Sequence, residues 1–383
     1  MENTKSQKKS YSTASSKSRV RRKTKTDYYD YSLLAVIILL TCFGLVMLYS
    51  TSSYNGEVKF GDAAFYLKKQ LFATVLGLIA MGMIANIDYH VWMRFGKAAY
   101  LLALALCVSV IFIGTTVNGS KRWLRLGPLS FQPSDFAKLC VIIFLATMIS
   151  RMPKQMGKFS TVIRVVVMVL PLVAVVAINN LSTAIIILGI AVALVFVASP
   201  KYLQFFLMGG LGVGFGAAFI MFESYRAERL KIWLHPEDYD KGYQTLQGLY
   251  AIGSGGLFGK GLGESLQKLG FVPEAQNDMI FSIICEELGL FGAISVILIF
   301  MFMIYRFMVI AGNAPDLMGA MIVIGVMAHI AIQVILNIAV VTNTIPNTGV
   351  TLPFISYGGT SVMFLMLEMG MVLSVSNQIK LEQ

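Results

Sequence analysis

The chain has 383 residues, of which 56% are hydrophobic and 13% are charged. Soluble domains carry about 25% charged residues, so this composition excludes an ordinary soluble enzyme and indicates an integral membrane protein. The 31 Lys and Arg outnumber the 20 Asp and Glu, which gives a formal net charge of +11. In a membrane protein this basic excess belongs to tails and loops, where it sets the orientation of the chain.

Residues 1–30 form a basic tail with nine Lys or Arg and almost no large aliphatic side chains. Such a composition predicts disorder. The tail lacks the apolar core and cleavage site of a signal peptide, so we expect the first span to stay as an anchor. The positive-inside rule places the tail in the cytoplasm. There it could contact anionic lipid headgroups, which we favour, or serve as a site for a partner protein.

Ten stretches are apolar enough, and near enough to about 20 residues, to cross a bilayer as helices. They lie at 31–51, 67–87, 97–114, 135–151, 160–178, 182–199, 203–222, 279–308, 317–342 and 354–376. The sequence therefore predicts an all-α polytopic membrane domain over 31–376 and a short cytoplasmic C-terminus, 377–383. Both termini are then cytoplasmic, and two large extracytoplasmic loops follow, at 115–134 and, between the seventh and eighth spans, at 223–277.

The first outer loop carries Lys121, Arg122 and Arg125 without any acid, which runs against the positive-inside rule. Solvated charge is one interpretation, but we favour an anionic ligand. The planar fork of Arg and the point charge of Lys both suit phosphate oxygens. A phosphorylated membrane lipid would meet this surface.

In the fourth span Asp135 and Lys138 are three residues apart, so they are expected to pair on one helix face. A structural ion pair is the interpretation we prefer for Asp135. Lys138 lies only a few residues below the basic loop, and it could also extend upward to a phosphate.

The long outer loop is predicted to contain helical pieces. Tyr225–Leu234 could form an amphipathic helix that ends before Pro236, and the glycine-rich stretch 253–263 permits positive φ angles. This stretch lacks the sequence and context of a nucleotide-binding P-loop. No cluster of His and acidic residues in the sequence predicts a protein metal site.

Asp278 closes the long loop immediately before the apolar run 279–310. Ionisable residues at a membrane edge are costly, so a functional role is the first hypothesis for this carboxylate. If helix extends back from the eighth span, Glu274 lies one turn before Asp278 and raises its pKa by like-charge repulsion. Pro273 makes a simple loop start an equal alternative.

Polar residues also lie inside the last three spans: Glu286, Glu287, His329, Gln333, Asn337 and Glu368. The three on the ninth span recur every four residues, so they share one face that should look into the bundle. Helix geometry places Glu286 on the same broad side as Asp278 and Glu287 nearly opposite. Interhelical hydrogen bonding is the favoured interpretation, with a proton or substrate path as the alternative.

Four groups of segments resemble the shape, elongation, division and sporulation family typified by FtsW, RodA and SpoVE. They are Asn118–Leu124 with Phe131–Asp135, Lys241–Gln247 with Gly253–Gly263, Pro273–Asp278 with Glu286–Gly289, and Pro346–Gly349 with Pro353–Gly359. The resemblance covers 31–376. It implies a peptidoglycan glycosyltransferase that polymerises lipid II at the outer face of the bacterial cytoplasmic membrane, beside a class B penicillin-binding protein and other division or elongation proteins. The family's essential acid corresponds to Asp278, and an important tryptophan corresponds to Trp123.

The chain departs from the family pattern at Asn180, where many relatives carry an acid at the start of the sixth span. Asn cannot act as a base, so a basic or cation-pairing role is in doubt there, whereas a hydrogen-bonding role could survive.

On this resemblance, Asp278 is the expected base that deprotonates the acceptor sugar hydroxyl. Lys121, Arg122 and also Lys138 would neutralise the departing pyrophosphate. Trp123 either stacks on a sugar face or anchors its loop at the interface. The reaction would invert the anomeric centre.

Further substrate contacts are expected from Glu274 and from the turn at Ser356, Gly358 and Gly359, which either presents backbone amides to an outer cavity or simply starts a helix. A divalent cation, Mg²⁺ or Mn²⁺, could bridge the pyrophosphate, whereas no organic cofactor and no nucleic-acid partner are expected. The rival functions are a lipid II flippase, which needs a continuous polar path, and a noncatalytic scaffold for division proteins.

Overall fold

The computed structural model describes residues 25–117, 120–126, 129–201 and 231–382. Within these ranges nine helices are long and apolar enough to cross a membrane. They are α1 (Tyr31–Phe60), α2 (Phe65–Ala85), α3 (His90–Ile113), α4 (Pro133–Arg151), α5 (Phe159–Asn179), α6 (Leu181–Ala198), α10 (Ile280–Gly312), α11 (Leu317–Val341) and α12 (Gly359–Asn377). The predicted all-α polytopic fold is confirmed. The expected seventh span, 203–222, and residues 1–24 of the basic tail lie outside the described residues.

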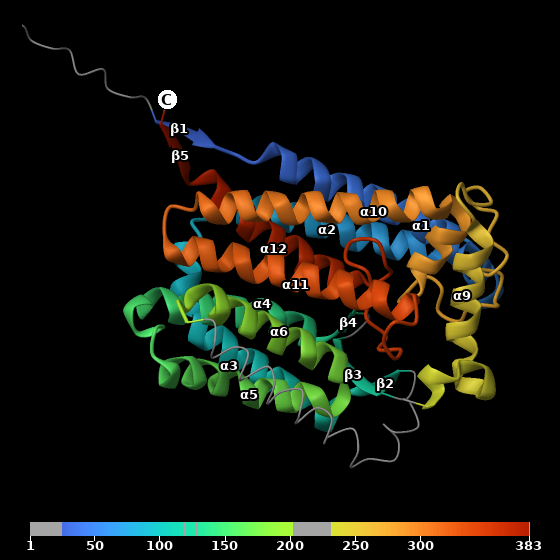
Figure 1. Cartoon of the computed structure of the whole chain (residues 1–383), viewed down its shortest axis with the longest axis horizontal. Coiled ribbons are helices and arrows are strands. Elements are labelled where there is room, and N and C mark those ends of the chain that lie inside the picture. The colour runs from blue at the N-terminus through green and yellow to red at the C-terminus, as the bar shows by residue number, and fades with distance from the viewer. Residues whose placement is uncertain (1–24, 118–119, 127–128, 202–230, 383) are drawn as a thin grey trace, which may run out of the picture.

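The membrane helices run alongside one another with alternating direction (Figure 1). α2 packs along α12, α4 lies against α3 and α11, and α5 pairs with α6. The connections at one end of the bundle carry the described parts of both termini, whereas the opposite end carries the longest connections and the short helix α9 (Tyr243–Gly255) (Figure 1). We refer to this second end as the loop end.

α4 and α11 form the centre of the bundle. In α4, 83% of the most apolar window is buried, compared with 28% in α2, α3 and α10. Large apolar side chains such as Phe72, Leu101 and Phe291 are exposed on these outer helices. Such exposure suits a helix that faces lipid on one side, because lipid tails are as apolar as the side chains themselves.

Several helix boundaries differ from the prediction. α1 continues to Phe60, nine residues beyond the predicted end, because polar residues such as Thr51 and Ser52 are buried in its last turns. It stops at Gly61, whose φ of 66° places it in the left-handed conformation that commonly ends a helix. α12 begins only at Gly359, so 342–358 is an irregular segment at the loop end.

Two small sheets were not predicted. In the first outer loop, β2 (Thr115–Val117), β3 (Ser120–Leu126) and β4 (Leu129–Phe131) form an antiparallel sheet in that order. At the other end, β1 (Lys25–Tyr28) pairs antiparallel with β5 (Ile379–Glu382). The predicted disorder is therefore wrong for 25–30. Asp30 caps α1 by accepting the N–H of Leu33 at 2.9 Å.

α10 has 33 residues and is interrupted at Gly289, where φ is 67° and ψ is −164°. At the interruption, backbone N–H and C=O groups of α10 form hydrogen bonds with the outer loop. Lys260 N–H donates to the carbonyl of Glu286 at 2.9 Å, and Leu290 N–H donates to the carbonyl of Gly256 at 3.0 Å. A side chain at Gly259 would approach the Glu287 carbonyl to 2.2 Å. The glycine-rich stretch therefore packs against α10 and has a structural role.

Candidate active site

Asp278 lies in a run of turns over 271–279, and α10 begins only at Ile280. Its side chain is buried, since the residue is 9% exposed. The expectation that helix extends back to Glu274 is wrong. The φ of 52° at Glu274 is incompatible with a right-handed helix. The alternative, a loop start after Pro273, is what the structure contains.

Three segments that are distant in sequence surround Asp278. Gln244, in the first turn of α9, places Nε2 3.5 Å from Oδ1 of the carboxylate. Asn337, on α11, donates from Nδ2 to the backbone carbonyl of Asp278 at 2.8 Å and to that of Val350 at 2.7 Å. A Cβ at Gly349 would lie 3.8 Å from Oδ2. The carboxylate is therefore enclosed by α9, α11 and the segment 342–358.

Burial raises the pKa of Asp278 to about 6, and the negative charge of Glu274 adds to the increase. N–H donors from the backbone and from Gln244 act in the opposite direction and hold the pKa below what burial alone would give. The like-charge effect predicted for Glu274 is thus present, although burial is the larger cause. A carboxylate with a pKa near neutrality is suited to general-base chemistry.

The predicted anion-binding residues lie on β3. Lys121 is exposed, Trp123 is half-buried, and Arg122 donates from Nε to the carbonyl of Asn179 at 3.0 Å. A cavity of about 20 Å³ opens beside them. Its polar lining consists of Lys121, Arg122, Ser134, Asn179 and Asn180.

A chain of contacts joins this cavity to Asp278. Asn180 caps α6 by accepting the N–H of Thr183 at 3.1 Å, which is the hydrogen-bonding role left open for it. One residue before Thr183, Ser182 donates to the carbonyl of Thr348 at 2.8 Å. Thr348 precedes Gly349, where an added Cβ would lie 3.8 Å from Oδ2 of Asp278. The contacts through Ser182, Thr348 and Gly349 therefore connect the basic strand with the acid. β3 and α9 both lie at the loop end (Figure 1).

Lys138 is buried inside the bundle. Its Nζ lies 3.1 Å from Oδ1 of Asp135, which confirms the predicted ion pair, and 3.4 Å from Oε1 of Gln333. Gln333 in turn contacts Nε2 of His329 at 2.8 Å. Lys138 thus takes part in a polar network between α4 and α11, with its charge matched by Asp135.

Ser356, Gly358 and Gly359 lie where 342–358 enters α12. Oγ of Ser356 accepts the N–H of Leu352 at 2.8 Å, and the N–H of Gly358 donates to Oε1 of Gln70 at 3.1 Å. Protein groups already use these hydrogen bonds, and Gly359 is the first residue of α12. The contacts favour the helix-starting turn over an amide site for substrate.

Glu286 and Glu287 both bind the outer loop. Glu286 accepts from Nζ of Lys260 at 2.7 Å, and Glu287 accepts from Nζ of Lys268 at 2.8 Å and from Oγ of Ser50. Both carboxylates are completely buried. The helical projection that grouped Glu286 with Asp278 does not hold, because Asp278 precedes the helix.

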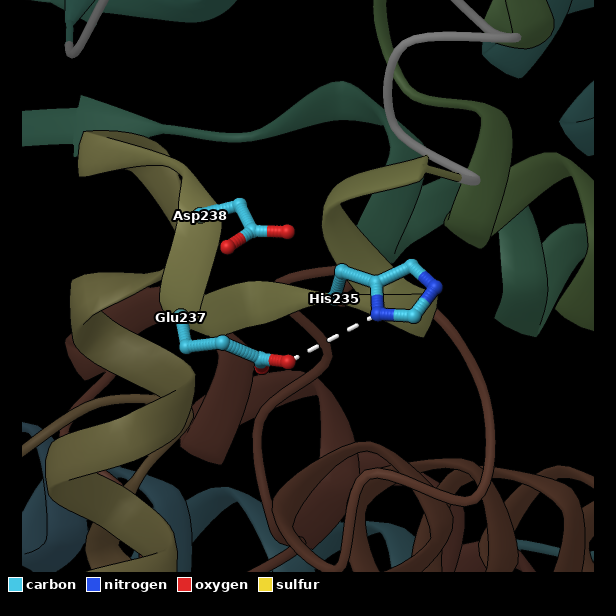
Figure 2. Close-up of side chains that lie close together, drawn as sticks. All are labelled: His235, Glu237 and Asp238. Carbon is cyan, nitrogen blue, oxygen red and sulfur yellow. Dashed lines mark ion pairs between the residues drawn. The ribbon is translucent and has the colours of Figure 1, made fainter.

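His235, Glu237 and Asp238 lie close together just before α9, as Figure 2 shows. One potential ligand atom from each lies within 4.8 Å of the others, and Nδ1 of His235 is 3.6 Å from Oε1 of Glu237. The sequence interpretation missed this grouping, which forms because a tight turn brings near neighbours together. All three are exposed, and exposed acids often gather without an ion, so the grouping alone does not define a metal site.

The contacts of Asp278 with Gln244 and Asn337 were also missed. Gln244 belongs to the segment 241–247 that carried the family resemblance, and Asn337 belongs to the four-residue repeat on α11. Each was noticed as part of a pattern, but neither pattern indicates that the residue meets Asp278.

Known proteins are similar to this chain in sequence and in fold. The family model described as cell cycle protein, for FtsW, RodA and SpoVE, matches residues 30–381. Stage V sporulation protein E of Bacillus subtilis (strain 168) is 38% identical over 359 residues, which cover 92% of this chain and 98% of that protein. The probable peptidoglycan glycosyltransferase FtsW of Geobacter sp. (strain M18) is 34% identical over 359 residues, with 92% and 98% covered.

Two solved structures match across nearly their whole length. A chain from the structure described as structural coordination of polymerization and crosslinking by a peptidoglycan synthase complex has a TM-score of 0.78 at 25% identity, covering 92% of this chain and 98% of that one. The crystal structure of the rod shape determining protein RodA of Thermus thermophilus has a TM-score of 0.69 at 24% identity, covering 92% and 97%. With a family model that matches almost every described residue, this multi-pass membrane protein belongs to the cell cycle protein family of FtsW, RodA and SpoVE.

Proposed function

We propose that this protein is a peptidoglycan glycosyltransferase that polymerises lipid II into glycan strands at the outer face of the bacterial cytoplasmic membrane. The observation that carries the proposal is the buried carboxylate of Asp278, with a pKa of about 6, in one connected region with the basic strand β3. Relatives of this chain are named probable peptidoglycan glycosyltransferases, which supports the same activity here.

The orientation follows from charge. The basic tail belongs on the cytoplasmic side, and β1 and β5 pair at the same end of the bundle. The loop end, with Asp278, then faces outward, where a lipid-linked substrate and a crosslinking class B penicillin-binding protein would meet it. The described synthase complex of a relative supports such a partner.

In the proposed reaction, Asp278 removes the proton from the 4-hydroxyl of the acceptor sugar as its oxygen attacks the anomeric carbon of the donor. A new glycosidic bond forms, the bond to undecaprenyl pyrophosphate breaks with its electron pair, and the anomeric centre inverts. Base assistance of this kind contributes about 10²- to 10⁴-fold.

Lys121 and Arg122 are proposed to neutralise the leaving pyrophosphate, because both are cationic residues of the acid-free strand β3 at the loop end. Asn180 adds no charge to the small cavity beside them, so it leaves the basic character of the cavity intact. Lys138 would join them only by exchanging its contacts with Asp135 and Gln333. A divalent cation such as Mg²⁺ or Mn²⁺, carried by the pyrophosphate, would supply further charge neutralisation.

The test is polymerisation of labelled lipid II by the purified protein with its penicillin-binding partner. Asp278→Asn should reduce polymer formation by about 10²- to 10⁴-fold, because the amide cannot accept the proton. Glu264→Gln is the control, since it removes an exposed carboxylate from the same loop. Normal polymer formation by Asp278→Asn would falsify the assignment.

One observation favours a second candidate function, a lipid II flippase. Lys138, Gln333, His329 and Glu368 form a buried polar network that extends into the middle of the membrane helices. Reconstituted protein that moves lipid II across vesicles, with Glu368→Ala abolishing transport but not polymerisation, would support it. Polymerisation without transport would support the enzyme alone.

A further inference from the structure

A ring of residues lies beside the carboxylate of Asp278. Gln244 contacts Oδ1, Asn347 contacts Gln244, and Gly349, two residues after Asn347, is near the carboxylate again, since a Cβ built on it would lie 3.8 Å from Oδ2. We propose that Gln244 is a positioning residue that orients the Asp278 carboxylate, and that Asn347 fixes the direction in which the Gln244 amide points. This inference rests on the proposed function, in which Asp278 is the base.

One backbone donor determines which atom of the Asn347 and Gln244 side-chain amides, oxygen or nitrogen, faces the next residue in the ring. The N–H of Gly349 donates to Oδ1 of Asn347 at 3.1 Å, so Nδ2 is the atom that Asn347 turns toward Gln244. That Nδ2 donates to Oε1 of Gln244 at 3.4 Å. Gln244 therefore presents Nε2, a donor, to Oδ1 of Asp278 at 3.5 Å and to the Pro273 carbonyl at 3.5 Å. A backbone N–H can only donate, so the polarity of the whole ring is determined.

The packing of α9 brings Gln244 to this position. Gly248, one helical turn later on α9, faces Met279, the residue after Asp278. A Cβ at Gly248 would lie only 2.2 Å from Cε of Met279. Glycine thus lets α9 approach the start of α10 closely enough for the Gln244 amide to reach the carboxylate.

The 3.4–3.5 Å separations in the ring are longer than the usual N···O distance of a hydrogen bond, about 2.7–3.2 Å. Catalytic hydrogen bonds are often long in a substrate-free site and shorten once the substrate is bound. Asp278 is already buried, and Gln244 supplies the side-chain donor to its carboxylate. Gln244 would then keep the carboxylate ionised and hold Oδ2 toward the acceptor.

The decisive variant is Gln244→Glu, which is close to isosteric. It retains an oxygen to accept from Asn347 and replaces the Nε2 donor with a second carboxylate oxygen. Both the lost donor and the added negative charge raise the pKa of Asp278. We expect the acid limb of the kcat/KM profile for lipid II polymerisation to move upward by about one pH unit or more. At neutral pH we expect kcat to fall about 10- to 100-fold with little change in KM.

Gln244→Ala separates the two effects, because it removes the donor without adding charge. Its acid limb should move in the same direction by a smaller amount. Asn347→Leu should produce the same kind of shift as Gln244→Ala, since it releases the Gln244 amide without touching Asp278. The matched control is Gln247→Ala, which truncates the same residue type one turn along α9 and should leave the profile unchanged.

The outcomes separate the inference from the proposed function. If Asp278→Asn polymerises lipid II normally, the proposed function fails. If Asp278→Asn is inactive but Gln244→Glu keeps the wild-type pH profile, the positioning role alone is overturned. A loss of kcat with an unshifted acid limb, or an equal effect of Gln247→Ala, assigns Gln244 a purely structural role and also overturns the inference. Thermal unfolding of each purified complex verifies that the variants are folded.

Discussion

His329 and Glu368 meet inside the bundle, with Nδ1 of the imidazole 2.7 Å from Oε2 of the carboxylate. Both residues are almost completely buried, and they join α11 to α12. The second oxygen, Oε1 of Glu368, has no hydrogen-bond partner within the described part of the chain. Burying a polar group without a hydrogen-bond partner costs free energy, so the contact with the imidazole matters for Glu368. The pair therefore joins α11 and α12 by a polar contact in the interior of the bundle.

Removing one member of this pair should destabilise the protein more than expected from the effect of removing both. His329→Ala leaves Glu368 without its partner and should lower the free energy of unfolding by about 3–5 kcal/mol. The double variant His329→Ala with Glu368→Ala removes both polar groups and should cost less than the sum of the single variants. Denaturant unfolding in detergent, arranged as a double-mutant cycle, measures the coupling. Additive effects would show that the contact contributes nothing.

Polymerisation should depend on pH through Asp278. Burial raises the pKa of this carboxyl to about 6, and only the ionised form accepts a proton. Activity should therefore be high above pH 7 and fall as the pH drops through about 6. A profile of kcat/KM between pH 5 and 8 checks this. An acid limb near 4, the ordinary range for Asp, would mean that the base is not buried as described.

Asp278→Asn should increase stability while it reduces activity. The pKa is raised from 3.8 to about 6 in the folded state, so the ionised carboxylate costs stability above about pH 6 and costs nothing below about pH 4. A shift of this size corresponds to about 3 kcal/mol at most. Thermal unfolding should show a higher Tm for the variant at pH 8 and no difference at pH 4. The opposite order at pH 8 would contradict the prediction.

The two lysines that bind the outer loop to α10 should differ in importance. The Lys268 side chain is 7% exposed and that of Lys260 is 32% exposed, while both partner glutamates are fully buried. Lys268→Met leaves Glu287 with only the Ser50 hydroxyl, whereas Glu286 keeps Ser265 and the N–H of Leu266 after Lys260→Met. Lys268→Met should therefore lower Tm more and increase hydrogen exchange over 256–270. Equal losses of Tm in the two variants would show that the burial of the lysine does not determine the loss of stability.

Gly289→Ala should release the outer loop from α10. A Cβ at Gly289 would lie 2.3 Å from the backbone N of Gly259 and 2.5 Å from the carbonyl O of Leu257, and the φ of 67° disfavours any side chain. Polymerisation should fall, because the same loop leads directly to Asp278. Gly312→Ala, where no atom lies within 4 Å, serves as the control at the other end of α10. A fully active Gly289→Ala would show that the loop tolerates displacement.

Within the described ranges, the nine membrane helices were predicted from the sequence, because apolar length alone identifies a span. The prediction failed where polar residues continue a helix. Thr51 and Ser52 look like the end of an apolar stretch, but they are buried within α1, which runs on to Phe60. The sheet formed by β2, β3 and β4 was missed because strands of three to seven residues in a polar loop leave little hydrophobic pattern.

The candidate site could be predicted only in part, because its residues are distant from one another in the sequence. Asp278 was found because an acid at a membrane edge is conspicuous in sequence. Its partners were not found, because Gln244 lies 34 residues before it and Asn347 lies 103 residues after Gln244. Such contacts depend on how the helices pack. The prediction that Glu286 shares a helix face with Asp278 failed because Asp278 precedes the helix. In addition, Glu286 and Glu287 each form an ion pair with a lysine of the loop.

The pairing of β1 with β5 makes the described chain nearly circular, because its first and last elements hydrogen-bond to each other along four residue pairs. A short linker could therefore join the two ends without moving a membrane helix. New termini could be opened at Pro153–Gln155, an exposed turn between α4 and α5 at the same end of the bundle (Figure 1). Circular permutation succeeds mainly at such exposed turns. A permuted protein of this kind would keep its insertion topology while presenting its ends beside the innermost helix, α4.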